Sequence, residues 1–225
     1  MKKIFKYTYY FFLSLKNRGL FFTLRLMYNE WYWEKKLGIS SMRIETLPAQ
    51  LSYSDSVREQ FHHYQGASFY ILHETFRHLP AEALNGRFID FGCGKARVLL
   101  VAANHGFSKI SGIDIDKELL EVARKNISVS KLNFNEVELK IKQADAATFQ
   151  IPDDCSVLFF FNPFGEVIMS AVKDNLLNSL SRKPRKLWVV YVNPKFESVW
   201  TDAGFREMYS LSSRNYVEAV ILQYN

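Results

Sequence analysis

The chain has 225 residues, of which 48% are apolar, and its formal net charge is +6. This length and composition are ordinary for one soluble globular domain with an appended segment. The two cysteines, Cys93 and Cys155, form no CxxC pair, and the five histidines show no metal-ligand spacing. We therefore expect no disulfide framework and no metal site, and a reducing, cytoplasmic location is the default.

The basic excess lies in the N-terminal segment. Residues 1–43 contain nine Lys and Arg but only two acids, Glu30 and Glu34, a balance of +7, so the rest of the chain carries −1. We expect this arm to meet an anionic surface, either lipid or nucleic acid. The uncharged run from Tyr7 to Leu15 has nine residues, about half of what a membrane-spanning helix needs. No small-residue cleavage site follows, so the run predicts neither a membrane span nor a secretory signal.

A helix is predicted directly after this run. Large apolar side chains recur there at helical spacing: Leu20, Phe21, Leu24, Met27, Tyr28 and Trp31. The first interpretation packs them on the domain, and the alternative is contact with a membrane surface or partner through residues 1–36. Residues 38–56 carry turn formers and small polar residues, as a linker does. The chain is thus divided into a basic, aromatic-rich helical arm with its linker, residues 1–56, and a domain, residues 57–225.

Strands and helices alternate from residue 87 onward. Apolar segments predict strands at 87–91, 109–115, 137–143, 156–161 and 186–192. Helices are predicted near 95–104, 117–128, 166–181 and 195–203. This alternation is typical of an α/β, doubly wound, mostly parallel sheet with helices on both faces. Residues 206–225 leave no room for a crossover helix, so two strands joined by SSRN should end the sheet in an antiparallel hairpin.

The segment DFGCG, residues 90–94, ends the first strand in a Gly-x-Gly turn that feeds a helix. Such a turn presents backbone N–H groups to a ligand, but Arg97 stands where a dinucleotide fingerprint has its third glycine. Asp90 would repel a pyrophosphate and suits a ligand with an ammonium group.

Asp114 ends the second strand, 22 residues after the first glycine, where a carboxylate can accept ribose hydroxyls. Asp145 follows the third strand and can accept from an adenine amino group. Ammonium, ribose and adenine together describe S-adenosylmethionine.

Four segments in this order resemble the motifs of class I S-adenosylmethionine-dependent methyltransferases: DFGCG, GIDID, ADA and FFFNPFG. The resemblance covers residues 64–224, and the family's seven-stranded sheet with a terminal antiparallel strand is similar to the predicted pattern. It implies S-adenosylmethionine as the cofactor. Asp90 and Gly92 would line its methionine end, with Gly94 in the same turn.

The resemblance assigns the rest of the cofactor site residue by residue. Asp114 would hold the ribose and Asp145 would face the adenine. By similarity to methyltransferases of the non-SET protein-lysine type, Tyr64 and Ser68 would touch the methionine portion; the alternative is an aromatic helix face packed on the sheet. Ala96 stands where many members have a further glycine.

The segment NPFG, residues 162–165, follows the predicted fourth strand. It looks like a shortened form of the Asn-Pro-Pro-aromatic motif of methyltransferases that act on amino nitrogens, with one proline missing. An Asn carbonyl can accept a hydrogen bond from a substrate amine, and an aromatic ring can stack on it. We therefore expect Asn162, Pro163 and Phe164 to be catalytic residues, with a protein lysine or similar amino nitrogen as acceptor. The alternative is a simple strand-ending turn.

Other classes of protein stay open at this stage. A small-molecule or nucleic-acid methyltransferase and a non-catalytic S-adenosylmethionine-binding module are alternatives, while Asp90 and the missing glycine disfavour a nicotinamide-dependent oxidoreductase. Asp116 is expected to cap the helix that follows it, and Cys93 to fill space in the turn. Lys95 and Arg97 are expected to be solvated or paired with an acidic neighbour.

Overall fold

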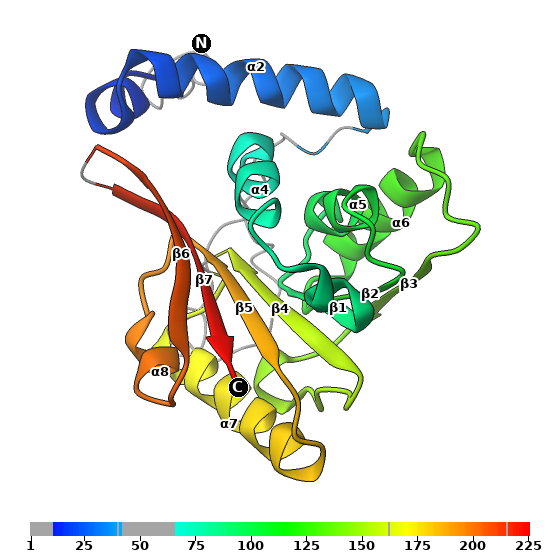
Figure 1. Ribbon diagram of the computed structural model, residues 1–225. Helices are drawn as coiled ribbons and strands as arrows, with labels where there is room; N and C mark the ends of the chain where they lie inside the picture. The colour runs from blue at the N-terminus through cyan, green and yellow to red at the C-terminus, as the bar shows by residue number, and fades with distance from the viewer. Residues whose placement is uncertain (1–10, 40, 42–65, 162, 215) are drawn as a thin grey trace.

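The computed structural model describes residues 11–39, 41, 66–161, 163–214 and 216–225. A seven-stranded sheet in the order β3-β2-β1-β4-β5-β7-β6 forms its centre (Figure 1). The strands are β1 (Arg87–Phe91), β2 (Lys109–Asp114), β3 (Glu138–Gln143), β4 (Cys155–Phe161), β5 (Leu187–Val192), β6 (Arg206–Ser213) and β7 (Tyr216–Tyr224). The helices include α2 (Leu20–Leu37), α4 (Phe69–Phe76), α5 (Arg97–Asn104), α6 (Lys117–Val129), α7 (Glu166–Arg182) and α8 (Ser198–Thr201), with 3-10 turns η1 (Ala81–Asn85) and η2 (Ala146–Thr148).

The pairing of the strands confirms the predicted fold class. Strands β1 to β5 pair in parallel, and β7 runs antiparallel to both β5 and β6. The chain is therefore an α/β, doubly wound protein whose sheet ends in the predicted antiparallel hairpin.

Two hydrophobic cores cover the two faces of this sheet. Phe88 of β1 lies in the core shared with α4, α5 and α6, whereas its neighbour Ile89 lies in the core shared with α7 and α8 (Figure 1). Successive strand residues point to opposite faces, so each strand contributes to both cores. β5 is buried along its whole length, as its unbroken apolar run predicts.

Two helices, α5 and α8, are shorter than predicted. Helix α5 begins at Arg97, because Ala96 has a φ of +68° and cannot continue into the helix from the turn. Helix α8 is only Ser198–Thr201, and hydrogen-bonded turns take the place of the helix predicted at 195–197 and 202–203. Apolar spacing alone does not reveal such turns.

Helix α2 packs on α4, but not through the face that its apolar spacing suggests. The Trp33 ring stacks on the His73 ring with centroids 3.7 Å apart, and Phe22 meets Tyr70 edge to face at 5.3 Å. The predicted apolar side chains are instead between 49% and 88% exposed. We call them the outer stripe: Leu20, Phe21, Leu24, Met27, Tyr28 and Trp31. The prediction that this helix packs on the domain is confirmed. The prediction that the outer stripe is the face that packs was wrong.

A buried arginine decides which face of α2 meets the domain. The Arg97 side chain is 4% exposed and forms ion pairs with Glu30 and Glu34 of α2. Its Nη1 also donates to the Ala67 carbonyl at 2.9 Å, and its Nε donates to Ser41 Oγ at 2.8 Å. Arg97 is thus paired with acidic neighbours, one of the two roles expected of it.

At the other end of α2, Arg18 fastens the arm to the terminal hairpin. Its Nη2 donates to Glu218 Oε2 at 2.9 Å, and its Nε also donates to Glu218. Glu218 belongs to β7 and has a side chain only 1% exposed. The predicted domain boundary between residues 56 and 57 lies outside the described residues. In the described ranges, no helix combines the length and the apolar content needed to cross a membrane.

Replacing Arg97 tests this anchor. Arg97→Met leaves two partly buried carboxylates without their cation, so we expect the free energy of unfolding to fall by about 3 kcal/mol, measured by urea denaturation. The control is Arg182→Met, whose ion pair with Asp153 is half exposed and should contribute less than about 1 kcal/mol. Equal losses in the two variants would contradict the anchor.

Candidate cofactor-binding site

The site lies at the carboxyl edge of the parallel strands, where the sheet changes winding direction. β1 has β2 on one side and β4 on the other, so the chain turns away from β1 in two directions at this edge. Open α/β sheets bind their ligands at this position, because the loops after neighbouring strands diverge and leave a crevice.

The predicted glycine turn follows β1 and is held by backbone hydrogen bonds. The N–H groups of Gly92 and Cys93 both donate to the Ile113 carbonyl at 2.9 Å. Gly92 has a φ of +80° and Gly94 a φ of +49°, values at which a side chain costs free energy. Ala96 takes a left-handed conformation with its methyl group buried, so the turn forms despite the departure from the family pattern.

Asp90 is the unusual residue of the site. Its side chain is only 2% exposed, and its Oδ2 has no hydrogen-bond partner among the described residues. Burial, and secondarily the nearby Asp114 carboxyl, raise the pKa of Asp90 well above its usual range. A buried carboxylate without a cation is unfavourable, so this position suits a ligand that brings positive charge.

Asp114 ends β2 beside this turn and already accepts two amide hydrogen bonds. Gly94 N–H donates to Oδ2 at 2.8 Å, and Asp116 N–H donates to Oδ1 at 2.9 Å. Burial raises the pKa of Asp114, and these amide bonds partly oppose the shift. Each carboxylate oxygen can accept a second hydrogen bond. Asp114 is therefore fixed in orientation and still able to receive the hydroxyls of a sugar.

Asp145 lies next to this strand end. The Ala144 N–H donates to the Asp114 carbonyl at 3.0 Å, which joins the end of β3 to the end of β2. The exposed Asp145 side chain caps η2 by accepting from Ala147 N–H at 2.9 Å. Asp116 caps α6 as predicted, accepting from Glu118 N–H at 2.8 Å.

The turn after β4 abuts the glycine turn. A Cβ atom on Gly92 would lie 2.9 Å from the Cβ of Pro163, so only glycine lets the two turns approach this closely. Phe164 is 5% exposed and belongs to the core on the α7 side. The predicted site residues Asn162 and Tyr64 lie outside the described residues.

Ser68, the remaining predicted residue, precedes α4. Its Oγ is buried and has no hydrogen-bond partner in the described part of the chain, and it does not cap the helix. The neighbouring Ala67 carbonyl accepts from Arg97, the first residue of α5, which places this segment near the end of the glycine turn. The hydroxyl is thus free to bond a ligand.

Gly112 in β2 is a structural residue of the site that the sequence reasoning missed. A Cβ atom there would lie 2.7 Å from Leu99 Cδ1 and 2.8 Å from Cys93 Sγ. The glycine turn therefore depends on a missing side chain in the neighbouring strand. A glycine inside a strand often marks such a close approach, and this signal was available in GIDID.

Comparison with known proteins agrees with this geometry. The family described as "Methyltransferase domain" matches residues 83–191. The chain is 31% identical over 147 residues to the type II methyltransferase M.VspI of Vibrio sp. (strain 343), a match covering 61% of this chain and 35% of that protein. It is 34% identical over 104 residues to the ribosomal protein L11 methyltransferase of Dictyoglomus thermophilum, covering 46% and 30% respectively. The chain thus spans about a third of the length of these curated relatives.

A solved structure shares the fold. The ribosomal protein L11 methylase from Lactobacillus delbrueckii subsp. bulgaricus superposes with a TM-score of 0.50 at 12% sequence identity, covering 80% of this chain and 83% of that one. Residues 83–191 thus match a methyltransferase domain, and the fold and the geometry of the site agree with that match. S-adenosylmethionine fits this site, because Asp90 Oδ2 is buried without a partner among the described residues and suits the cationic methionine end.

Neutralising Asp90 tests the electrostatic character of the site. We expect Asp90→Asn to raise the free energy of unfolding of the ligand-free protein at neutral pH by about 1–2 kcal/mol, because it removes a buried charge. The folded-state pKa of Asp90 is raised, so the wild-type penalty grows as the pH rises from the unfolded-state pKa toward that raised pKa and is constant above it. It vanishes below about pH 4, where the group is protonated in both folded and unfolded chains.

Urea denaturation at several pH values measures this difference, with Asp202→Asn at an exposed position as the matched control. Two results would contradict the account: an Asp90→Asn variant less stable than wild type at neutral pH, or a gain that persists unchanged in acid.

Proposed function

We propose that the chain transfers a methyl group from S-adenosylmethionine to an amino nitrogen, with a protein as the acceptor. The observation that carries the proposal is the buried Asp90 Oδ2, which has no partner among the described residues and lies near the Asp114 carboxyl. Two neighbouring carboxyls at the ends of β1 and β2 favour a cationic amino-acid nucleoside and disfavour a diphosphate.

Each strand end has its own task in binding the cofactor. Asp90 faces the ammonium group, the glycine turn lets the ligand approach the backbone, and Asp114 accepts the ribose hydroxyls. Asp145 retains one carboxylate oxygen beyond its cap to Ala147 N–H and accepts from the adenine amino group. When bound, S-adenosylmethionine supplies a sulfonium methyl group. A C–N bond to the acceptor forms as the C–S bond breaks. The electrons of the C–S bond stay on sulfur, and the acceptor nitrogen gives up a proton.

The chain's contribution to the transfer is mainly positioning. An in-line displacement needs the nitrogen lone pair aligned with the methyl carbon and water excluded, and it needs no strong base. The turn after β4 supports this role, because Pro163 packs within van der Waals reach of Gly92 at the methionine end. Asn162 lies outside the described residues, and the sequence motif predicts that its side chain would accept a hydrogen bond from the acceptor amine. Phe164 is buried beneath the turn, where it would support the turn.

Two similarities to known enzymes favour an amino group on a protein over other amines as the acceptor. One of the curated relatives is named for methylation of ribosomal protein L11. The shortened Asn-Pro-aromatic turn is similar to the motif of enzymes that methylate amino nitrogens. A nucleic-acid base amine is the main competing acceptor, because the N-terminal arm is basic.

Transfer of a labelled methyl group tests the proposal. The full chain is incubated with methyl-labelled S-adenosylmethionine and a cell lysate, which is then separated into protein, nucleic acid, lipid and small molecules. We expect the label in protein. Asp114→Asn should reduce incorporation at least about tenfold through weaker cofactor binding, whereas Asp153→Asn, which lies before β4 at the other edge of the sheet, should not.

The variants separate the two parts of the proposal. Asn162→Ala should lose transfer while keeping its affinity for S-adenosylmethionine. Label in nucleic acid would overturn the protein acceptor and keep the methyltransferase, whereas cofactor binding without transfer to any fraction would overturn the enzymatic activity.

A further inference from the structure

We propose that the outer stripe of α2 docks this protein on the surface of an anionic phospholipid bilayer. The stripe is one continuous apolar face of the helix, and its most exposed members are Phe21 at 88% and Trp31 at 60%. Figure 1 shows α2 lying across the top of the molecule, with only its lower side over α4. An exposed patch of this kind on a helix marks an interaction surface.

The stripe is not needed to hold α2 in place. The opposite face of the helix is anchored by the ion pairs of Arg97 with Glu30 and Glu34 and by the stacking of Trp33 on His73. The outer stripe therefore stays exposed while the helix is fully docked on its own domain. Its side chains are available to a partner without any rearrangement of the fold.

The charges of α2 favour an anionic partner. Both acids of the helix, Glu30 and Glu34, point inward to Arg97, away from the outer stripe, and Arg97 offsets one of their two charges. Its exposed cations remain, and Lys35 lies beside the stripe, with its Nζ 5.2 Å from the centre of the Trp31 ring. Bulky apolar and aromatic side chains flanked by lysines and arginines are typical of helices that lie in the headgroup region of a bilayer.

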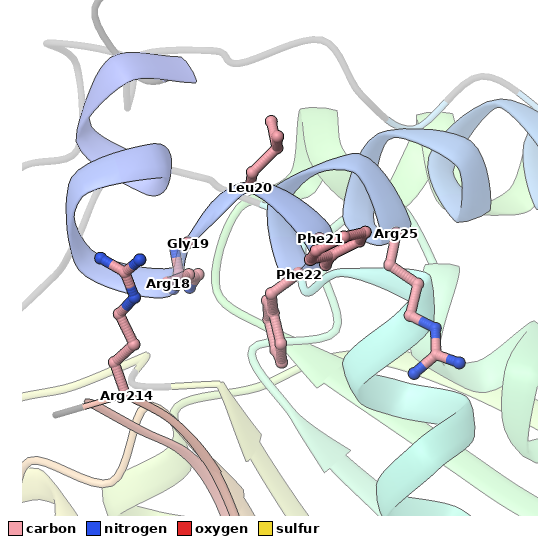
Figure 2. Close-up of a pocket in the computed structure, with 7 residues that line it drawn as sticks. All are labelled: Arg18, Gly19, Leu20, Phe21, Phe22, Arg25 and Arg214. Carbon is pink, nitrogen blue, oxygen red and sulfur yellow. The ribbon is translucent and has the colours of Figure 1, made fainter.

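A basic hollow lies at the N-terminal end of the stripe. Its volume is about 610 Å³. The lining residues, drawn in Figure 2, are Arg18, Gly19, Leu20, Phe21, Phe22, Arg25 and Arg214. Arg18 is neutralised by Glu218, but Arg25 and Arg214 form no ion pair within the described ranges. In Figure 2 the Leu20 side chain points away from these two guanidinium groups, and the Arg25 guanidinium donates to the Tyr70 hydroxyl. The positive charge of Arg25 and Arg214 at this end of α2 favours an anionic headgroup.

The arm lies at the same edge of the sheet as the cofactor site. Arg97 starts α5 directly after the glycine turn, and Glu218 lies just beyond the end of β5, where its carbonyl accepts from Asn193 N–H at 2.8 Å. The two anchors of α2 therefore span the carboxyl edge of the sheet. Docking through the stripe would hold this edge close to the membrane surface.

Vesicle sedimentation of the full chain tests the docking. One set of vesicles is pure phosphatidylcholine, and the other contains equal parts of phosphatidylcholine and phosphatidylglycerol. We expect binding to the anionic vesicles, and a loss of at least about tenfold in Phe21→Glu with Trp31→Glu, because two apolar side chains no longer enter the interface. Arg25→Gln with Arg214→Gln should weaken anionic binding by about fivefold per arginine.

The matched control replaces two exposed apolar residues elsewhere, Val167→Glu with Met208→Glu, and should bind like wild type. All variants are first checked for unchanged affinity for S-adenosylmethionine, which reports on an intact fold. The proposal would be overturned if wild type did not bind to anionic vesicles, or if the Phe21→Glu/Trp31→Glu variant bound to them as tightly as wild type. It would also be overturned if wild type were a dimer in solution and this variant alone were a monomer. That result would assign the stripe to a second copy of the chain.

Discussion

The structure of the site follows from two carboxyl groups, Asp90 and Asp114, brought close together at the ends of neighbouring parallel strands. Burial opposes the ionisation of both groups and raises the pKa of each, the nearby Asp114 carboxyl adds to the shift at Asp90, and the chain supplies compensating amide hydrogen bonds only to Asp114. The glycine turn directs its Gly94 N–H to Asp114, and the start of the next helix adds the Asp116 N–H. Asp90 receives no such bond at Oδ2 from the described residues. The cost of this arrangement is offset when a positively charged ligand binds.

The same turn connects the cofactor site to the N-terminal arm. Left-handed backbone at Gly92, Gly94 and Ala96 redirects the chain from β1 into α5, and the first residue of that helix is Arg97. Arg97 then uses its buried guanidinium to hold Glu30 and Glu34 of α2. Only a few residues thus separate the glycine turn of the candidate site from the anchor that orients the outer stripe. The methyltransferase fold and the surface that we assign to a lipid bilayer share one edge of the sheet.

Much of this architecture could be predicted from the sequence because it depends on local patterns. The apolar runs of β4 and β5, the DFGCG turn and the acids near the ends of β1, β2 and β3 all lie where the sequence indicated. The inward face of α2 could not be predicted, because hydrophobic periodicity assigns the apolar face to the interior, while here a buried ion pair with Arg97 outweighs it. The sequence signals Gly112 only as a glycine inside a strand; its contacts, Leu99 of α5 and Cys93 of the glycine turn, are known only from the structure. The roles of Tyr64 and Asn162 stay predictions, as both lie outside the described residues.

The central claim is that paired carboxyls at this sheet edge select an amino-acid nucleoside over a dinucleotide that carries a diphosphate. Isothermal titration calorimetry of the ligand-free full chain with S-adenosylmethionine, S-adenosylhomocysteine and NAD measures that selectivity directly. The account predicts one-site binding of both amino-acid nucleosides, which share the ammonium, ribose and adenine groups, and no measurable heat of binding with NAD. Binding of NAD as tight as that of S-adenosylmethionine would contradict it.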